Sequence, residues 1–349
     1  MRLRSLQVFR VRGPVAGLAG AAAGQTQRAG LLVQVRDDDG IRGQGEASPL
    51  PGYSRDTLDE CATQLAAVDP AAIAPPGDGS AIDWVAQALD RVGLRAPAAR
   101  FAIETALLDW LGRRRGLGIA ALLGTADAAA RSVPLAALVG DLAAARAAHA
   151  RGIRAFKLKI APATFDDDLA LAQALREEFG SGFALRFDAN GKLAAADAPA
   201  RLQQLARFAP EFVEEPVRFD DLRRITAAPV PLAADESLAL PGAWPALATL
   251  CRVVVLKPTL LGGIAACVRL ARDAAARGLA ATVTHTFDGP IALAAAAELA
   301  LALDSPLACG LDRHPALAAW PAVSIPQIGT CRVACADRPG LGLPDIVVG

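Results

Sequence analysis

The sequence predicts an α/β protein built around a parallel (β/α) barrel, with an α+β domain before it. Its 349 residues exceed one average domain, which favours two domains or a barrel with an addition. From about Ser132 onward, short apolar runs alternate with Ala/Leu/Arg-rich helical stretches, as they do in βα units. The ends of these runs recur every 21 to 29 residues, a spacing typical of a barrel.

Residues 1–125 show a different pattern, in which strands come first and helices follow. An alternating run opens the chain, and the next two runs indicate a hairpin that turns at Asp39-Gly40. A helix should begin after Thr57, because Thr57 and Glu60 have the spacing of a capping box. A longer helical pattern ends at Gly116. We therefore expect a compact α+β domain over residues 1–125.

Eight apolar runs should form the barrel over residues 126–318, with the active site at the C-terminal ends of the strands. An open, doubly wound sheet is the alternative, but no Gly-rich phosphate-binding sequence follows any of the runs. Residues 319–349 contain no further βα unit, and we expect them to pack back on the first domain. The eight runs are VPLAALV, AFKLKI, FALRFDANG, FVEEPV, PLAADES, VVVLKP, ATVTHT and ACGLD.

Charge and cysteine content narrow the class of partner and the compartment. The chain has 36 basic and 36 acidic residues, which argues against a general grip on nucleic acid or on an anionic membrane. A small molecule is the expected partner. Six scattered cysteines without paired CxxC spacing indicate reduced thiols in a cytoplasm, with neither zinc nor a disulfide framework. No uninterrupted apolar run reaches the roughly 20 residues that span a bilayer, so we expect a soluble protein.

Charged side chains inside the predicted strands need an explanation, because parallel barrel strands are buried on both faces and mostly apolar. Taken one at a time, these side chains have structural explanations: a strand edge that faces solvent, an Asx turn or a helix cap. Taken together, they occupy late positions in consecutive strands, where side chains converge on one mouth. The ordered series therefore favours one shared site, made of Lys157, Lys159, Asp188, Glu214, Asp235 and Lys257.

The three carboxylates of this series would form an oxygen-rich site on adjacent strands. Such a site suits Mg²⁺, which prefers carboxylate and water ligands, and Mn²⁺ shares that preference. Zinc would require histidine or cysteine ligands. The chain has three histidines, and of these His285 alone falls within a predicted barrel strand.

The lysines beside this metal site indicate proton abstraction from the carbon next to a substrate carboxylate. That proton is too weakly acidic for an unaided side chain, whereas a divalent ion on the carboxylate stabilises the enediolate that forms. A neutral lysine then takes the proton. Lys157 and Lys159 should lie about 7 Å apart on one strand face, and at an effective dielectric of about 20 their repulsion is about 2 kcal/mol. Lys157 therefore favours the neutral form of Lys159, with further help from the metal charge and from burial.

Six segments of the sequence resemble the enolase superfamily, in the branch that contains muconate-lactonizing enzymes and o-succinylbenzoate synthases. They run through nearly the whole chain and read, in order, GEASPLPGYSRDTL, KLK, FDANG, VEEP, ADES and LKPTLLGG. The resemblance implies a (β/α) barrel with an N-terminal α+β capping domain. It also implies that Asp188, Glu214 and Asp235 bind the metal. In the acidic pairs of VEEP and ADES, the resemblance assigns metal binding to the first acid of each pair.

The resemblance also implies a role for each remaining charged group. Lys159 would be the base and Lys157 its electrostatic partner. Lys257 would stay charged on the opposite face of the substrate and help to stabilise the enediolate. Asn190 would support the metal ligands, and Glu236 would hydrogen-bond Lys257.

The SPLPGYS segment favours o-succinylbenzoate synthase among the activities of this branch. Such enzymes carry a similar loop in the domain that covers the barrel mouth, and they dehydrate 2-succinyl-6-hydroxy-2,4-cyclohexadiene-1-carboxylate on the route to menaquinone. N-acylamino acid racemases remain an alternative, because they need only two facing lysines and a tolerant pocket. Dipeptide epimerases usually carry an Asp-x-Asp on the last strand, and here Gly310 stands in place of the first acid. A barrel kept only for binding should have lost part of the charged series, which is complete here.

Three further residues are expected near the substrate. His285 stands where serine is common in similar synthases, and the preceding run has no aspartate to make it a base, so we expect a substrate contact or a core histidine. Arg28, in the loop after the first strand, is expected to hold an anionic group, and Gly310 to line the pocket. The sequence leaves the oligomeric state open.

Overall fold

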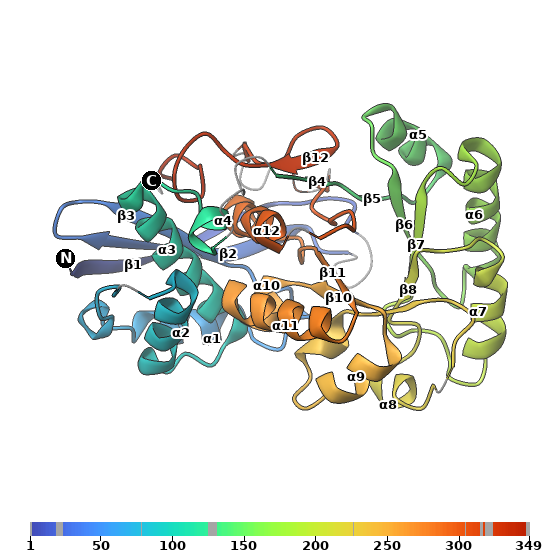
Figure 1. Ribbon diagram of the computed structural model, residues 1–349, viewed down its shortest axis with the longest axis horizontal. Coiled ribbons are helices and arrows are strands. Elements are labelled where there is room, and N and C mark those ends of the chain that lie inside the picture. The colour runs from blue at the N-terminus through green and yellow to red at the C-terminus, as the bar shows by residue number, and fades with distance from the viewer. Residues whose placement is uncertain are drawn as a thin grey trace.

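The computed structural model describes residues 2–18, 24–77, 79–124, 131–225, 227–303, 305–314, 317 and 324–346. These residues form an N-terminal domain with an antiparallel sheet and a larger α/β part with a curled parallel sheet (Figure 1). The α/β class and the parallel barrel architecture predicted from the sequence are therefore confirmed. Within the described residues, no helix combines the length and the apolar character that crossing a membrane requires.

The N-terminal domain consists of an antiparallel sheet, in the order β1-β2-β3, and the helices that follow it. Strands β2 and β3 form the predicted hairpin, with Gly40 at φ +86° in its turn. Thr57 and Glu60 make both hydrogen bonds of the predicted capping box. The elements are β1 (Leu3–Pro14), β2 (Gln27–Asp37), β3 (Arg42–Ala47), α1 (Leu58–Ala66), a 3-10 turn (Pro70–Ala72), α2 (Ala81–Val92), α3 (Pro97–Arg115) and α4 (Ile119–Leu122).

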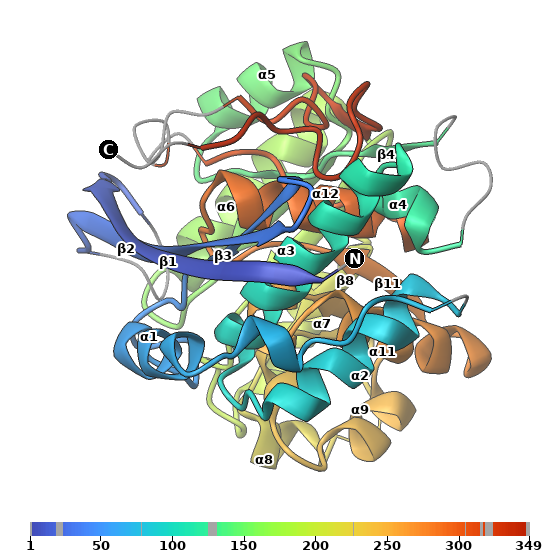
Figure 2. The ribbon, with the colours of Figure 1, turned by 90° about the vertical axis from the view of Figure 1, so that its left-hand side faces the viewer.

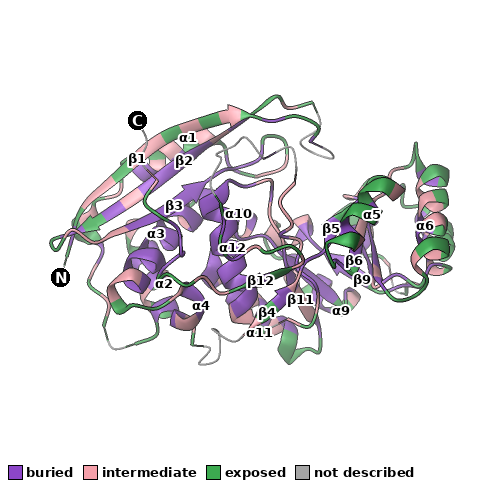
Figure 3. Ribbon diagram, turned by 90° about the horizontal axis from the view of Figure 1, so that it is seen from above, coloured by how far each residue is buried: buried purple, intermediate pink, exposed green. Residues whose placement is uncertain are grey.

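The long helix α3 packs against the sheet of this domain (Figure 2). Two glycines of β3 permit the close approach, and a Cβ atom at Gly45 would lie only 1.8 Å from the Ala102 carbonyl oxygen. The helix ends before Gly116, as predicted. Figure 3 shows α3 buried beside α10 (Pro258–Leu261) and α12 (Pro290–Leu303). One hydrophobic core therefore continues from this domain into the larger part.

The larger part is a parallel sheet in the order β11-β10-β9-β8-β7-β6-β5, with helices between successive strands. Each strand is short, and strands that are adjacent in this order pair in parallel. Its strands are β5 (Ala137–Leu138), β6 (Ala155–Lys159), β7 (Ala184–Asp188), β8 (Phe212–Glu214), β9 (Leu232–Ala234), β10 (Val253–Leu256) and β11 (Ala280–Val283). The other helices are α5 (Leu142–Ala150), α6 (Phe165–Phe179), α7 (Ala198–Ala206), α8 (Phe219–Leu222), α9 (Trp244–Leu250) and α11 (Ile264–Ala276), with a 3-10 turn at Glu236–Ala239.

The eighth predicted run, ACGLD, differs from the prediction, because it is not a regular strand. It contributes one parallel bridge on each side, from Cys309 to Leu135 and from Gly310 to Thr284. Pairing extends over a single residue on each side, so the run is too short to count as a strand. These bridges nevertheless link the two edges of the seven-stranded sheet and close the barrel.

The chain after the barrel contacts both parts of the molecule. Strand β12 (Arg332–Ala334) pairs with β4 (Ser132–Pro134), the segment before β5. Further on, the Ile346 N–H donates to Gln44 Oε1 at 2.7 Å, and Gln44 Nε2 donates to the Pro344 carbonyl at 3.0 Å. These contacts hold residues 344–346 against the N-terminal sheet. The two boundaries between the three segments drawn from the sequence stay predictions.

Candidate active site

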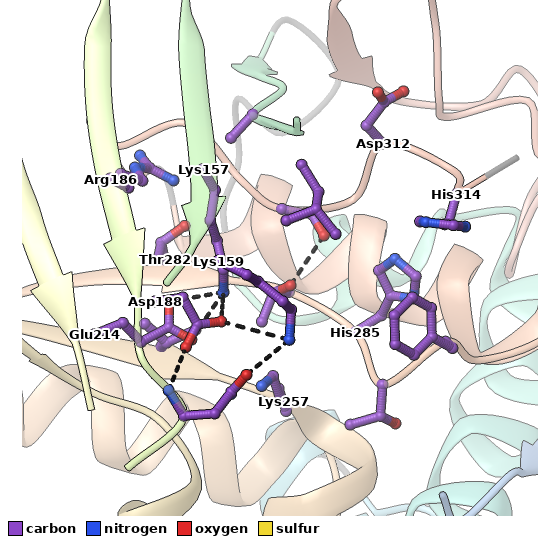
Figure 4. A pocket seen from close by; sticks show the side chains of 18 of the residues that line it. Lys157, Lys159, Arg186, Asp188, Glu214, Lys257, Thr282, His285, Asp312 and His314 are labelled. Atoms are coloured by element: carbon purple, nitrogen blue, oxygen red, sulfur yellow. Dashed lines mark hydrogen bonds and ion pairs between the residues drawn. The ribbon is translucent and has the colours of Figure 1, made fainter. Parts of the chain in front are cut away.

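Five members of the charged series, all except Asp235, are seen together at the C-terminal edge of the parallel sheet (Figure 4). Lys159 on β6 lies opposite Asp188 at the end of β7, and Asp188 lies opposite Glu214 at the end of β8. Asp235 directly follows β9, and Lys257 directly follows β10. The parallel register therefore brings together side chains that are far apart in the sequence.

These side chains lie at one cavity. Five of the six charged residues line it, and the sixth, Asp235, is 3% exposed and contacts Lys257. Leu50 and Tyr53 of the N-terminal domain line the same cavity. Another part of its wall comes from the segments after β11 and around residues 310–314. The cavity is thus built from both domains.

Lys157 and Lys159 make different contacts although they share one strand. Lys157 Nζ lies 2.8 Å from Asp188 Oδ2 and 2.9 Å from both carboxylate oxygens of Glu214. Lys159 Nζ donates to Asn190 Oδ1 at 2.7 Å and lies 3.9 Å from Asp188 Oδ2. Lys157 is therefore embedded between two carboxylates, whereas Lys159 has only one, at longer range.

These surroundings shift the pKa values of the two lysines in opposite directions. Burial lowers the pKa of Lys157, but Asp188 and Glu214 outweigh burial and the net pKa lies above the ordinary value of 10.5. Burial also lowers the pKa of Lys159, and the charges of Lys157 and Lys257 lower it further while Asp188 opposes them. The net pKa of Lys159 is lowered. Of this pair, Lys159 is the better base near neutral pH.

Tyr53 is a functional candidate that the sequence analysis missed. Its hydroxyl accepts a hydrogen bond from Lys257 Nζ at 2.6 Å and lies 3.1 Å from Asp235 Oδ2 and 3.3 Å from Glu236 Oε2. The Lys257 ammonium also lies 4.9 Å from the Tyr53 ring centroid. Glu236 was expected to hydrogen-bond Lys257, and in the described part of the chain the Tyr53 hydroxyl connects these two side chains. Tyr53 belongs to the SPLPGYS segment, which served as a family signal, but no individual role was predicted for this residue.

The three carboxylates fit a hard divalent cation by chemistry and by charge. All three are nearly fully buried, at 1 to 3% exposure. Burial and the charge of Asp188 raise the pKa of Glu214 to about 8, and Asp235 Oδ1 is buried with no hydrogen-bond partner among the described residues. Buried, crowded carboxylates with an unpaired oxygen are satisfied by a bound cation. As the side chains lie, no three described His, Cys, Asp or Glu residues form a ready metal site. Lysine ammonium groups contact each of the three carboxylates.

Neutral and apolar groups line the wall that includes His285. Burial lowers the pKa of His285 to about 4, so its imidazole is neutral at pH 7, and Nδ1 is buried with no partner in the described part of the chain. Gly310 is part of the lining, and a Cβ atom there would lie 2.7 Å from Thr284 Oγ1. Its contact with substrate stays a prediction. Asp312 also lines the cavity, but both of its oxygens accept hydrogen bonds from Arg151, at 2.8 and 2.5 Å.

Two buried arginines complete the surroundings of the site. Arg186, two residues before Asp188, lines the cavity and pairs with Glu211 at 2.6 Å. Its charge within an otherwise apolar strand was a signal from which it could have been predicted. Arg28 is 1% exposed and donates to backbone carbonyl groups, one of them that of Phe287. It is not among the described residues that line the cavity, and its expected anion-binding role stays a prediction.

Two family models together match nearly the whole chain. Residues 5–124 match the mandelate racemase / muconate lactonizing enzyme N-terminal domain, and residues 141–344 match the enolase C-terminal domain-like family. This chain belongs to the enolase superfamily. The resemblance found in the sequence is thereby confirmed, together with the fold that it implied.

Similar members of the enolase superfamily differ in the reactions that their names describe. The o-succinylbenzoate synthase of Desulfotalea psychrophila is 32% identical over 75% of this chain and 80% of that protein. The L-Lys-D/L-Arg epimerase of Methylococcus capsulatus is 31% identical over 90% of each chain. The crystal structure of the dipeptide epimerase from Methylococcus capsulatus, complexed with Mg and the dipeptide L-Arg-D-Lys, has a TM-score of 0.82 and 28% identity, and covers 98% of this chain and 99% of that chain. Membership of the superfamily therefore leaves the individual reaction to the site.

Proposed function

We propose that this enolase-superfamily enzyme is an o-succinylbenzoate synthase, which dehydrates 2-succinyl-6-hydroxy-2,4-cyclohexadiene-1-carboxylate to o-succinylbenzoate in menaquinone biosynthesis, in the cytoplasm. The observation that carries the proposal is the pair of lysines at one cavity, with Lys159 shifted toward its neutral form and Lys257 held by Asp235 and Tyr53. Proton removal next to a carboxylate needs such a base. Similarity to an o-succinylbenzoate synthase supports the choice of reaction.

Asp188, Glu214 and Asp235 would hold Mg²⁺, or Mn²⁺ in its place, with Asn190 supporting them. Bound there, the ion would supply positive charge to the substrate carboxylate and lower the cost of the negative charge that develops beside it.

The residues of this chain account for the movement of the proton. Lys159 Nζ takes the proton from the ring carbon that bears the carboxylate. The bond from the neighbouring ring carbon to its hydroxyl group then breaks, and the ring becomes aromatic. Lys159 returns its proton to the departing hydroxide, which leaves as water. Lys257 keeps its positive charge and, with Tyr53 beside it, stabilises the negative charge of the carboxylate during this sequence.

The wall around Gly310 supports dehydration over dipeptide epimerisation. A dipeptide carries an ammonium group that needs a free carboxylate. Gly310 has no side chain, and the Asp312 carboxylate is occupied by the two hydrogen bonds from Arg151. Among the described residues on this wall, neutral groups such as His285 face the cavity instead.

Racemisation of N-acylamino acids is the second candidate. It requires two lysines at the same α-carbon, and Lys159 and Lys257 both line the cavity. The similarity to the epimerase of Methylococcus capsulatus over 90% of the chain supports this alternative. An N-acylamino acid has no ammonium group, so it does not need the Asp312 carboxylate, which Arg151 already occupies.

The ultraviolet absorbance of the purified protein mixed with the cyclohexadiene substrate tests the proposal. We expect rapid conversion to o-succinylbenzoate with Mg²⁺ present and loss of that conversion after EDTA. An unchanged substrate would reject the synthase. In that case, exchange of the α-proton of N-succinylamino acids with deuterated water would identify a racemase, and the absence of both reactions would reject both candidates.

A further inference from the structure

Arg28 lies near the start of β2 and links two loops from different domains. Its guanidinium donates from Nη2 to the Ser48 carbonyl at 2.8 Å and from Nη1 to the Pro49 carbonyl at 3.1 Å. From Nε it donates to the Phe287 carbonyl at 3.2 Å. The planar group therefore joins the loop after β3 to the loop after β11. Burial lowers the pKa of Arg28, and the nearby Asp288 and Glu46 carboxylates oppose that effect.

Both joined loops line the cavity. The loop after β3 supplies Leu50 and Tyr53, and the loop after β11 supplies His285 and Phe287. Tyr53 in turn contacts Lys257. A change in the separation of the two loops would therefore change the shape of the cavity.

Phe287 has an unusual backbone conformation that needs support. Its φ of +55° lies in the left-handed region, which non-glycine residues rarely adopt. Such a conformation persists only where the surroundings hold it. The hydrogen bond from Arg28 holds its carbonyl, and the Asp288 carboxylate after it accepts from the N–H and the hydroxyl of Thr286, at 3.1 and 2.8 Å.

A small apolar cluster beside the cavity, the cap cluster, includes side chains from the same two loops. It is separate from the main core, and Tyr53 and Phe287 pack against it. The Phe287 ring also makes edge-to-face contacts with His285 and His314, at centroid distances of 6.1 and 5.4 Å. The buried members of the cap cluster are Val15, Leu18, Leu50 and Leu317.

We infer that Arg28 is a positioning residue for substrate binding, because it fixes the Tyr53 loop relative to the Phe287 loop and so sets the wall that receives the part of the substrate remote from its reacting carboxylate. This inference rests on the proposed function for the identity of the cavity. Arg28 acts without touching substrate, since these donors face backbone carbonyls. The fork of donors in arginine spans both loops, which the compact ammonium of lysine does not do.

Steady-state kinetics of Arg28→Lys and Arg28→Met, with Mg²⁺ present, test the inference. Arg12→Met is the matched control, because Arg12 is exposed and pairs with Ala29 on the neighbouring strand. We expect KM to rise about tenfold or more in both Arg28 variants, with kcat within about threefold of wild type, because Lys159 and Lys257 stand on the barrel strands and Asp235 still holds Lys257. The control should keep the wild-type KM.

Arg28→Lys separates this inference from direct anion binding. Arg28→Lys could keep the wild-type KM while Arg28→Met raises it. This result would show that the positive charge matters and that the hydrogen bonds between the two loops do not, and it would overturn the inference. A fall in kcat at unchanged KM in Arg28→Lys would also overturn it. If Arg28→Met does not fold, Phe287→Ala takes its place, and an unchanged KM in that variant would contradict the role of the wall.

Hydrogen exchange gives a readout that does not depend on the reaction. Peptides that cover residues 48–53 and 285–289 should exchange about tenfold faster or more in Arg28→Lys than in Arg12→Met, while peptides from α6 should not change. If the wild-type protein neither dehydrates nor racemises, the proposed function has failed and exchange alone decides the inference. Equal exchange in the two variants would then overturn it.

Discussion

Lys157 and Lys159 lie two residues apart on β6, yet the structure prepares them for different tasks. Lys157 contacts two carboxylates at 2.8 to 2.9 Å, which keep it charged despite burial. Lys159 has its nearest carboxylate at 3.9 Å, and two positive neighbours add to the effect of burial. The strand alone puts both lysines on one face. Their different partners raise the pKa of Lys157 and leave the pKa of Lys159 lowered.

The pH dependence of the reaction should report the coupling between these lysines. Because the base must be neutral, kcat/KM should rise with pH through the lowered pKa of Lys159. Lys157→Met removes a positive charge that lowers this pKa, so the rise should move to higher pH. Measured pH–rate profiles of both proteins check this expectation, with the exposed Lys192→Met as the control. A rise at the same pH in Lys157→Met would contradict the coupling.

The sequence was informative about residues whose position follows from strand periodicity. Asp188, Glu214 and Lys257 could be placed at one mouth, because charged groups at the ends of buried parallel strands have few other places to go. Tyr53 and the partners of Arg28 could not be predicted in the same way. Tyr53 comes from a loop, and Arg28 donates to carbonyl groups, which every residue has. Only the folded chain shows which carbonyls come within reach.

At the scale of elements, two helices of the barrel begin at buried carboxylates from the N-terminal domain. Glu46 on β3 accepts hydrogen bonds from the N–H groups of Gly289 and Ile291, at 2.7 and 3.1 Å, where α12 starts. Glu104 on α3 accepts from the Ala265 N–H at 2.8 Å, where α11 starts. The first N–H groups of a helix have no partners within it, so these carboxylates satisfy them and favour one arrangement of the two domains.

Glu104 should make stability depend on pH. Burial raises its pKa from 4.5 to about 7 in the folded chain, so the folded state holds an extra proton between these values. The contribution of Glu104 to the free energy of unfolding is then largest below pH 4.5 and falls as the pH rises to 7, by about 3 kcal/mol in all. Glu104→Gln stays neutral and should lose this dependence. Urea unfolding of both proteins at pH 5 and pH 8 checks it, and parallel changes in both would refute the assignment.

Local signals also decided which elements the sequence could predict. The hairpin at Asp39-Gly40, the capping box at Thr57 and the helix end at Gly116 depend on neighbouring residues, and all three are present. The eighth run was predicted as a strand from its composition. Its actual pairing depends on segments near Leu135 and Thr284, far away in the sequence, which allow one bridge each.

For the whole molecule, the hydrophobic core is continuous across both domains. The main buried cluster includes Leu31 and Phe101 of the first domain together with Leu185 and Ile291 of the barrel. In addition to this shared core, the Glu104 and Glu46 carboxylates, which contact the starts of α11 and α12, are buried at the junction between the domains. Separating the domains would therefore expose apolar surface and leave buried charges without partners.

The two domains should consequently unfold together. We expect one transition on heating, with the same midpoint by far-ultraviolet circular dichroism and by calorimetry. Hydrogen exchange should show protected amides of α3 and β7 opening with similar free energies. An N-terminal domain that melts several degrees before the barrel would contradict the shared core.

The most direct test of the central claim, that Lys159 is the base of a dehydration, is the turnover of the cyclohexadiene substrate by Lys159→Ala. The variant should lose turnover by at least about a thousandfold, because the proton has no acceptor, and should still bind Mn²⁺ nearly as wild type does. Asp188→Asn should weaken both properties. Substantial dehydration by a folded Lys159→Ala protein would contradict the account.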